Sequence, residues 1–89
     1  MKKQRDKSKI IQNILQCIQD GNNIPTHIMY ATQLSWKTFD KYLNNIILSE
    51  LIEVHVIGDE HNRQKYLYTI TPKGKRLLKI MYEIQEIIQ

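Results

Sequence analysis

The sequence predicts a mainly helical α+β domain with one small β-sheet. Three observations predict it: apolar residues recur every three or four positions in three segments, two short segments have the period-two pattern of β-strands, and 89 residues suffice for a single core. Hydrophobic residues make up 42% of the chain and charged residues 25%, as is typical of folded globular proteins. So small a domain leaves little room for a deep catalytic cleft, and we expect no enzymatic activity.

Two helices are expected at the start of the chain. The first covers Ser8 to Asp20 and ends at Gly21, which adopts the left-handed conformation of a helix cap without strain. A short second helix begins at about Pro25, because proline suits the first helical position, and runs to about Thr32. The apolar residues of the first helix share one face; they are Ile10, Ile11, Ile14, Leu15 and Ile18.

The third predicted helix runs from Ser35 to about Ser49. Ser35 is a good N-cap, because its hydroxyl can accept a hydrogen bond from a backbone N–H two or three residues further on. One face of this helix is apolar and consists of Phe39, Leu43, Ile46 and Ile47. The opposite face is polar and consists of Lys37, Asp40, Lys41, Asn44 and Asn45. We expect the first face to pack and the second to meet solvent.

A hairpin and a last helix complete the prediction. Apolar and polar residues alternate from Ile52 to Val56, which indicates a half-buried strand, and a second strand follows from Lys65 to Ile70. The loop between them makes a β-hairpin. Thr71 can then cap a helix that begins at Pro72 and continues toward the C-terminus.

The order helix, helix, helix, strand, strand, helix is that of a winged helix-turn-helix domain with an extra C-terminal helix. In addition, the sequence resembles the small archaeal winged-helix DNA-binding proteins that dimerise through a C-terminal antiparallel coiled coil. The residues that carry this resemblance are Ile28-Met29-Tyr30, Leu34-Ser35-Trp36, Tyr42-Leu43, Leu51-Ile52-Glu53 and Tyr68-Thr69-Ile70-Thr71-Pro72-Lys73-Gly74.

The resemblance implies a homodimer that binds duplex DNA, either as a transcriptional regulator or as a chromatin-associated protein, without enzyme activity. The chain departs from the family pattern at two places. Ser49-Glu50 stands where the family often has a glycine, and Asp59-Glu60 brings acid into the wing.

From the element order and the resemblance together, we expect three regions in the chain. They are a flexible basic arm over residues 1–7, a winged helix-turn-helix domain over 8–71 and a coiled-coil dimerisation helix over 72–89.

The predicted DNA contacts centre on helix 35–49, placed in the major groove. Lys37, Lys41 and Asn44 share its outer face, and lysine and asparagine side chains can reach base edges. Ser35 and Thr38 lie at its N-terminus, where unpaired backbone N–H groups attract phosphate. Trp36 is expected to pack on a sugar or to shield the core.

Two basic zones supply further predicted contacts. Residues 1–9 hold five basic side chains against one acidic one, and residues 61–79 hold no acid. In the wing, residues 58–65, we expect Arg63 and Lys65 to contact the DNA backbone or the minor groove. In the arm, we expect salt-sensitive affinity that does not depend on base sequence from Lys2, Lys3 and Arg5.

The last helix carries the predicted dimerisation surface. Its apolar residues follow a heptad-like spacing, and their exposure on a monomer would be costly. They are Leu77, Ile80, Met81, Ile84, Ile87 and Ile88. Leu78 is expected to cover the chain's own core. The alternative is that this helix folds back along the first helix of its own chain.

Other functions receive less support. Residues 10–89 are neutral overall, which leaves open a winged-helix module that binds proteins and not DNA. Cys17, the single cysteine, is expected in the core, and the three histidines lack the spacing of a zinc site, so we expect no metal and no cofactor. No apolar run is long enough to cross a membrane. We expect a cytoplasmic, nucleoid-associated protein.

Overall fold

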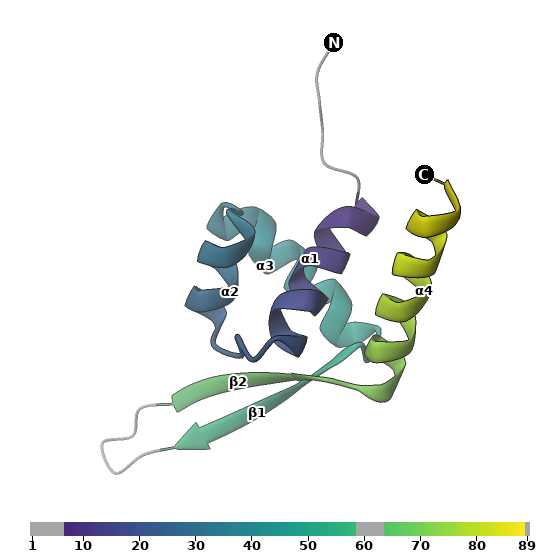
Figure 1. Cartoon of the computed structure of the whole chain (residues 1–89). Helices are drawn as coiled ribbons and strands as arrows, with labels where there is room; N and C mark the ends of the chain where they lie inside the picture. The colour runs from purple at the N-terminus through teal and green to yellow at the C-terminus, as the bar shows by residue number, and fades with distance from the viewer. Residues whose placement is uncertain (1–6, 59–63, 89) are drawn as a thin grey trace.

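The computed structural model describes residues 7–58 and 64–88. Within these ranges, the helices α1 (Lys7–Gln19), α2 (Pro25–Thr32) and α3 (Trp36–Leu48) are followed by the strands β1 (Ile52–Gly58) and β2 (Gln64–Ile70), and then by helix α4 (Pro72–Ile88). Figure 1 shows the first three helices gathered on one side of the hairpin, with α4 beside α1. The predicted fold class is confirmed: the chain is mainly helical, and its two antiparallel strands form the wing.

One core lies between α1, α2, α3 and the base of the hairpin. The predicted apolar stripes of α1 and α3 face it, although Ile11 and Ile47 are only half-buried. Tyr42 is also buried, because it lies beside Leu43 and widens the apolar face of α3. The largest fully buried side chains are Phe39, Ile14, Leu15, Ile28, Ile46 and Leu78. The expectation that Leu78 covers the chain's own core is therefore confirmed.

The hairpin is antiparallel, with Ile52 opposite Ile70 and Gly58 opposite Gln64. The prediction of a half-buried β1 is wrong for most of its length: Ile52 is buried, but Val54 and Val56 are 36% and 56% exposed. Figure 1 shows the reason, since the strands diverge from the helices toward the outer end of the hairpin. The alternation of apolar and polar residues does produce a strand here, yet no layer of the described residues covers the outer half of its apolar face.

Backbone turns fix how the helices meet. Gly21 has φ of 104°, in the left-handed region, as predicted for the cap of α1. Gln33, between α2 and α3, has φ of 57°, and its N–H donates to the carbonyl of Tyr30 at 3.2 Å. Glu50, which follows α3, has φ of 59°. This is the turn where the resembled family often has glycine, so Glu50 adopts a conformation that suits glycine better.

Candidate nucleic-acid interface

The outer face of α3 is the best-formed candidate surface. Its predicted cap is confirmed: the Ser35 hydroxyl accepts a hydrogen bond from the Thr38 backbone N–H at 3.3 Å. Lys37, Lys41 and Asn44 are all exposed, and their spacing of four and three residues places them on one face of the helix. The structure therefore brings together the side chains that were predicted to read bases.

Trp36 lies at the first turn of α3 and has two environments. Its ring centroid lies 5.8 Å from that of Phe39, at an interplanar angle of 47°, so it covers one side of a core residue. More than half of its surface, 57%, remains exposed. Both roles considered from the sequence are thus open to Trp36, because the side chain contacts Phe39 and is still more than half exposed.

Lys41 and Asp40 are neighbours on α3 but have different surroundings. The Lys41 Nζ lies 5.9 Å from the centroid of the Tyr42 ring, a distance typical of a weak cation–π contact. Burial, followed by the neighbouring charges of Tyr66 and Asp40, raises the pKa of the Tyr68 hydroxyl above its usual range.

The wing and the arm are described only in part. Lys65 is exposed in β2 opposite Ile57, so its ammonium group is available to a ligand. The other predicted basic contacts, Arg63 in the wing and Lys2, Lys3 and Arg5 in the arm, lie outside the described residues.

Tyr30 is an additional candidate that sequence reasoning did not assign to the site. It lies in the last turn of α2, and its side chain is 75% exposed. A tyrosine in this position can donate a hydrogen bond to a phosphate and pack on a sugar. The sequence did contain an indication of its exposure. Ile28 and Met29 mark the inward side of α2, and Tyr30 follows them on a different side of the helix.

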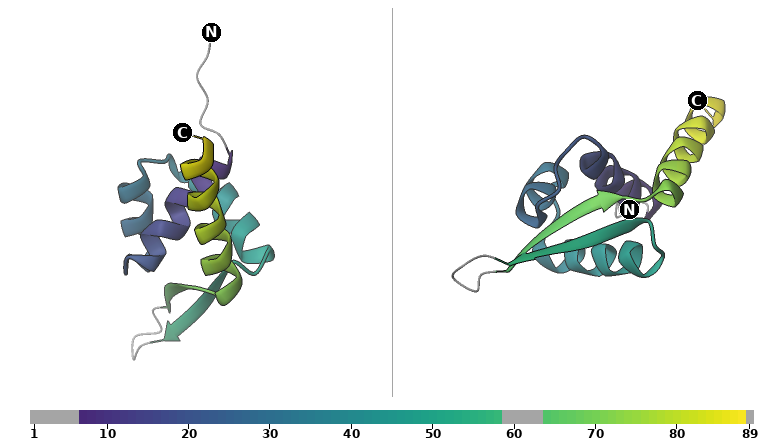
Figure 2. Two further views of the ribbon diagram at one scale, coloured as in Figure 1. Left: turned by 45° about the vertical axis from the view of Figure 1, so that its right-hand side comes forward. Right: turned by 90° about the horizontal axis from the view of Figure 1, so that it is seen from below.

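The face of α4 that was predicted to dimerise is partly exposed. Leu77 and Met81 are half-buried, Ile80 and Ile84 are 43% and 48% exposed, and the two residues near the end of the helix, Ile87 and Ile88, are 83% and 76% exposed. Figure 2 shows α4 at the edge of the molecule, beside α1. The chain alone therefore leaves a row of isoleucines in contact with water.

An adjacent side of α4 is held against α1 by polar groups, so part of the fold-back alternative is present. Gln12 and Gln85 exchange amide hydrogen bonds at 3.2 and 2.9 Å, and the Tyr82 hydroxyl donates to Gln16 at 2.8 Å. Gln12 is buried, so its amide depends on this partner. Apolar spacing could not predict these contacts, because glutamine and tyrosine fall outside the pattern that indicates packing.

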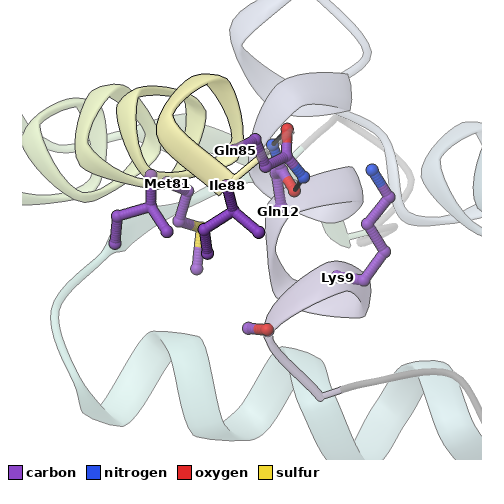
Figure 3. A pocket seen from close by; sticks show the side chains of 7 residues that line it. Lys9, Gln12, Met81, Gln85 and Ile88 are labelled. Carbon is purple, nitrogen blue, oxygen red and sulfur yellow. Dashed lines mark hydrogen bonds between the residues drawn. The ribbon is translucent and has the colours of Figure 1, made fainter.

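A shallow groove of about 250 Å³ adjoins the glutamine pair, between the start of α1 and the end of α4. Figure 3 shows Lys9 reaching from α1, with Met81 and Ile88 on the α4 side. The full lining consists of Ser8, Lys9, Gln12, Met81, Ile84, Gln85 and Ile88. The groove is continuous with the exposed isoleucines, since it shares Ile84 and Ile88 with them.

Other kinds of site have little support in the described part of the chain. Residues 7–58 and 64–88 contain no cluster of three or more His, Cys, Asp or Glu side chains that could hold a metal ion. Within the same ranges, no helix is long and apolar enough to span a membrane. Cys17 is half-buried, and burial, followed by the charge of Asp20, raises the pKa of its thiol. A raised pKa lowers the thiolate population and with it the reactivity of this cysteine.

Comparison with known proteins places the chain in a family. The uncharacterized protein MJ0287 of Methanocaldococcus jannaschii is 34% identical over 84 residues, which cover 94% of this chain and 77% of that protein. Protein MJ0290 of the same organism is 36% identical over 84 residues, but the chain spans only 36% of its length. Among solved structures, a PadR-like transcription factor from Bacteroides fragilis superposes with a TM-score of 0.83 at 13% identity, over 92% of this chain and 84% of that one. The winged helix-turn-helix family model matches residues 4–89, and the chain therefore belongs to this family.

Proposed function

We propose that this protein binds double-stranded DNA as a homodimer, with α3 in the major groove. The observation that carries the proposal is the exposed face of α3, where two ammonium groups and one amide share a single side of a helix with a capped, solvent-facing N-terminus. Lys37, Lys41 and Asn44 would read base edges. Ser35, Trp36 and Thr38 would contact the backbone, since phosphate is attracted to helix N-termini.

The wing and the arm would strengthen binding without reading sequence. Lys65 and Arg63 would contact phosphates or enter the minor groove beside the recognition helix. Lys2, Lys3 and Arg5, in the proposed arm of residues 1–7, would add counterion-release affinity. A protein that binds in this way would be associated with the nucleoid.

Dimerisation through α4 would give the complex its two-fold symmetry. The exposed isoleucines of the proposed dimerisation helix, residues 72–89, supply an apolar surface that a second copy would bury. The charges along α4 favour an antiparallel pairing, because Lys75 and Lys79 lie in its first half while Glu83 and Glu86 lie in its second. In that orientation, the basic end of each helix faces the acidic end of its partner.

The biological role would be regulation of transcription or organisation of chromatin. Asparagine on the recognition face favours a regulator, because Asn44 can pair with adenine through two hydrogen bonds and so distinguish sequences. The similarity in fold to the PadR-like transcription factor from Bacteroides fragilis supports the same role.

Substitution of the two lysines tests the proposal. Lys37→Ala combined with Lys41→Ala should weaken binding to a short duplex by about tenfold or more at low salt, because two phosphate-neutralising or base-reading charges are removed. Fluorescence anisotropy measures the affinity. Lys79→Ala, an exposed lysine on α4, is the matched control and should change the affinity little. Equal losses in both proteins would contradict the assignment of α3, and tight binding of a protein in place of DNA would favour the protein-interaction module.

A further inference from the structure

We propose that Thr71, Lys73 and Gly74 form a clasp that joins the end of α3 to the start of α4. The clasp makes the recognition helix and the dimerisation helix one rigid unit, so that the dimer sets the separation of its two recognition helices. Its consequence for DNA rests on the proposed function, whereas the rigid connection between the two helices does not.

Thr71 supplies the centre of the clasp. Its hydroxyl donates a hydrogen bond to the carbonyl of Glu50 at 2.7 Å and accepts one from the backbone N–H of Gly74 at 3.0 Å. Its own backbone N–H donates to the carbonyl of Leu51 at 3.1 Å. A single residue therefore caps α4 and at the same time binds the turn that ends α3.

Lys73 and Gly74 extend the same contact. The Lys73 Nζ donates to the carbonyl of Ser49 at 2.8 Å, so it pairs with the C-cap residue of α3. Gly74 is buried, and a Cβ at its position would collide with the carbonyl oxygen of Leu51 and would lie 2.8 Å from Cγ1 of Ile70. The start of α4 can approach this turn so closely only because residue 74 has no side chain.

The clasp joins two points that lie far apart in the chain. Glu50 and Thr71 are 21 positions apart in the chain, and the intervening residues form the hairpin, whose outer half diverges from the helices. The base of the hairpin, where Ile52 pairs with Ile70, also brings these ends together. Buried Leu78 and the Gln12–Gln85 hydrogen bonds hold α4 to the rest of the chain, and the clasp adds a direct connection between the end of α3 and the start of α4. The clasp also explains the residue types of the segment 71–74. Thr71 supplies the hydroxyl, Lys73 supplies the ammonium group, and Gly74 allows the close approach of the two backbones.

In a symmetric dimer, this connection would control DNA binding through geometry. Each α4 lies at the two-fold axis and each α3 lies on the DNA, so the angle between them sets the distance between half-sites. A loose connection would lower the effective concentration of the second recognition helix once the first has bound. The clasp residues would therefore act as positioning residues without touching DNA.

The test compares Thr71→Val, which removes the hydroxyl but keeps the shape, with Thr71→Ser, which keeps the hydroxyl. Spin labels are placed at Asn45→Cys on α3 and Glu83→Cys on α4, two exposed positions, in a Cys17→Ala background. Dilution with unlabelled protein leaves only the distance within one chain, which pulsed electron spin resonance measures. Binding of the same unlabelled variants to a random duplex of about 25 base pairs gives the functional readout.

Thr71→Val should broaden the distance distribution about twofold, because the α3–α4 junction gains freedom, and should weaken duplex binding by about tenfold. Thr71→Ser should match the wild type in both. If circular dichroism shows that Thr71→Val does not fold, Lys73→Met replaces it, since this variant removes only an exposed hydrogen bond. A folded Thr71→Val or Lys73→Met with wild-type width would overturn the clasp, as would equal broadening in Thr71→Ser. If the wild-type protein gives a narrow distribution of spin-label distances but does not bind the duplex, the proposed function is overturned and the rigid connection between α3 and α4 stands.

Discussion

At the scale of single residues, the chain holds a glutamate where its backbone favours glycine. Glu50 has φ of 59°, and its carbonyl accepts the hydrogen bond from Thr71, so the turn conformation is held by its neighbours. Glu50→Gly should raise the free energy of unfolding by about 1 kcal/mol, because glycine relieves the steric cost of the left-handed conformation. Urea unfolding measures the change. Glu53→Gly in β1 is the control and should destabilise, and a loss of stability in Glu50→Gly would contradict the reasoning.

The residue scale also shows what the sequence could reveal about the site. Caps are local features, so the roles of Ser35 and Thr71 at the starts of α3 and α4 followed from residue type and position. The Thr71 hydrogen bond to Glu50 joins residues that are far apart in the chain, and spacing within one helix contains no information about it. The buried amide pair of Gln12 and Gln85 was missed for the same reason.

At the scale of elements, α4 has two unlike sides. Glutamines and Tyr82 tie one face to α1, while the isoleucines of the adjacent face remain exposed. Ile87→Glu should therefore leave the fold of the chain intact but prevent dimerisation. Each buried isoleucine stabilises by roughly 1.5–3 kcal/mol, so the change in both copies should raise the dimer Kd by on the order of a hundredfold or more.

Sedimentation equilibrium measures the effect of Ile87→Glu. Val56→Glu places the same charge on an exposed apolar position of the hairpin and is the matched control, which should leave the mass unchanged. A wild-type protein that is monomeric at all concentrations, or an Ile87→Glu variant that still dimerises, would contradict the proposed interface.

The elements themselves were largely predictable, but their burial was less so. Periodic apolar spacing identified α1, α3 and α4 to within a few residues, since each carries a stripe of apolar side chains, whereas Pro25 marked the start of α2. The alternation in β1 identified a strand, yet Val54 and Val56 are exposed because burial depends on which element packs over a strand. The exposure of Tyr30 likewise depends on the angle at which α2 meets its neighbours.

At the scale of the whole molecule, charge and fold together favour a nucleic-acid ligand. The chain has a formal net charge of +4, and its basic residues concentrate in the arm and in residues 61–79. The fold adds the exposed polar face of α3. The basic segments and this face lie in different parts of the chain, and both favour a nucleic-acid ligand. A protein-interaction module would need neither the basic arm nor the lysines of α3.

Affinity for a random duplex of about 25 base pairs, measured across a salt series, tests the DNA-binding proposal most directly. Each phosphate that a lysine or arginine neutralises lowers the slope of log K against log salt by about 0.9. A dimer in which Lys37, Lys41 and Lys65 of both copies each neutralise a phosphate on a random duplex should give a slope of about −5 or steeper. The absence of binding at low salt, or binding that does not depend on salt, would contradict DNA binding and favour a winged-helix protein-interaction module.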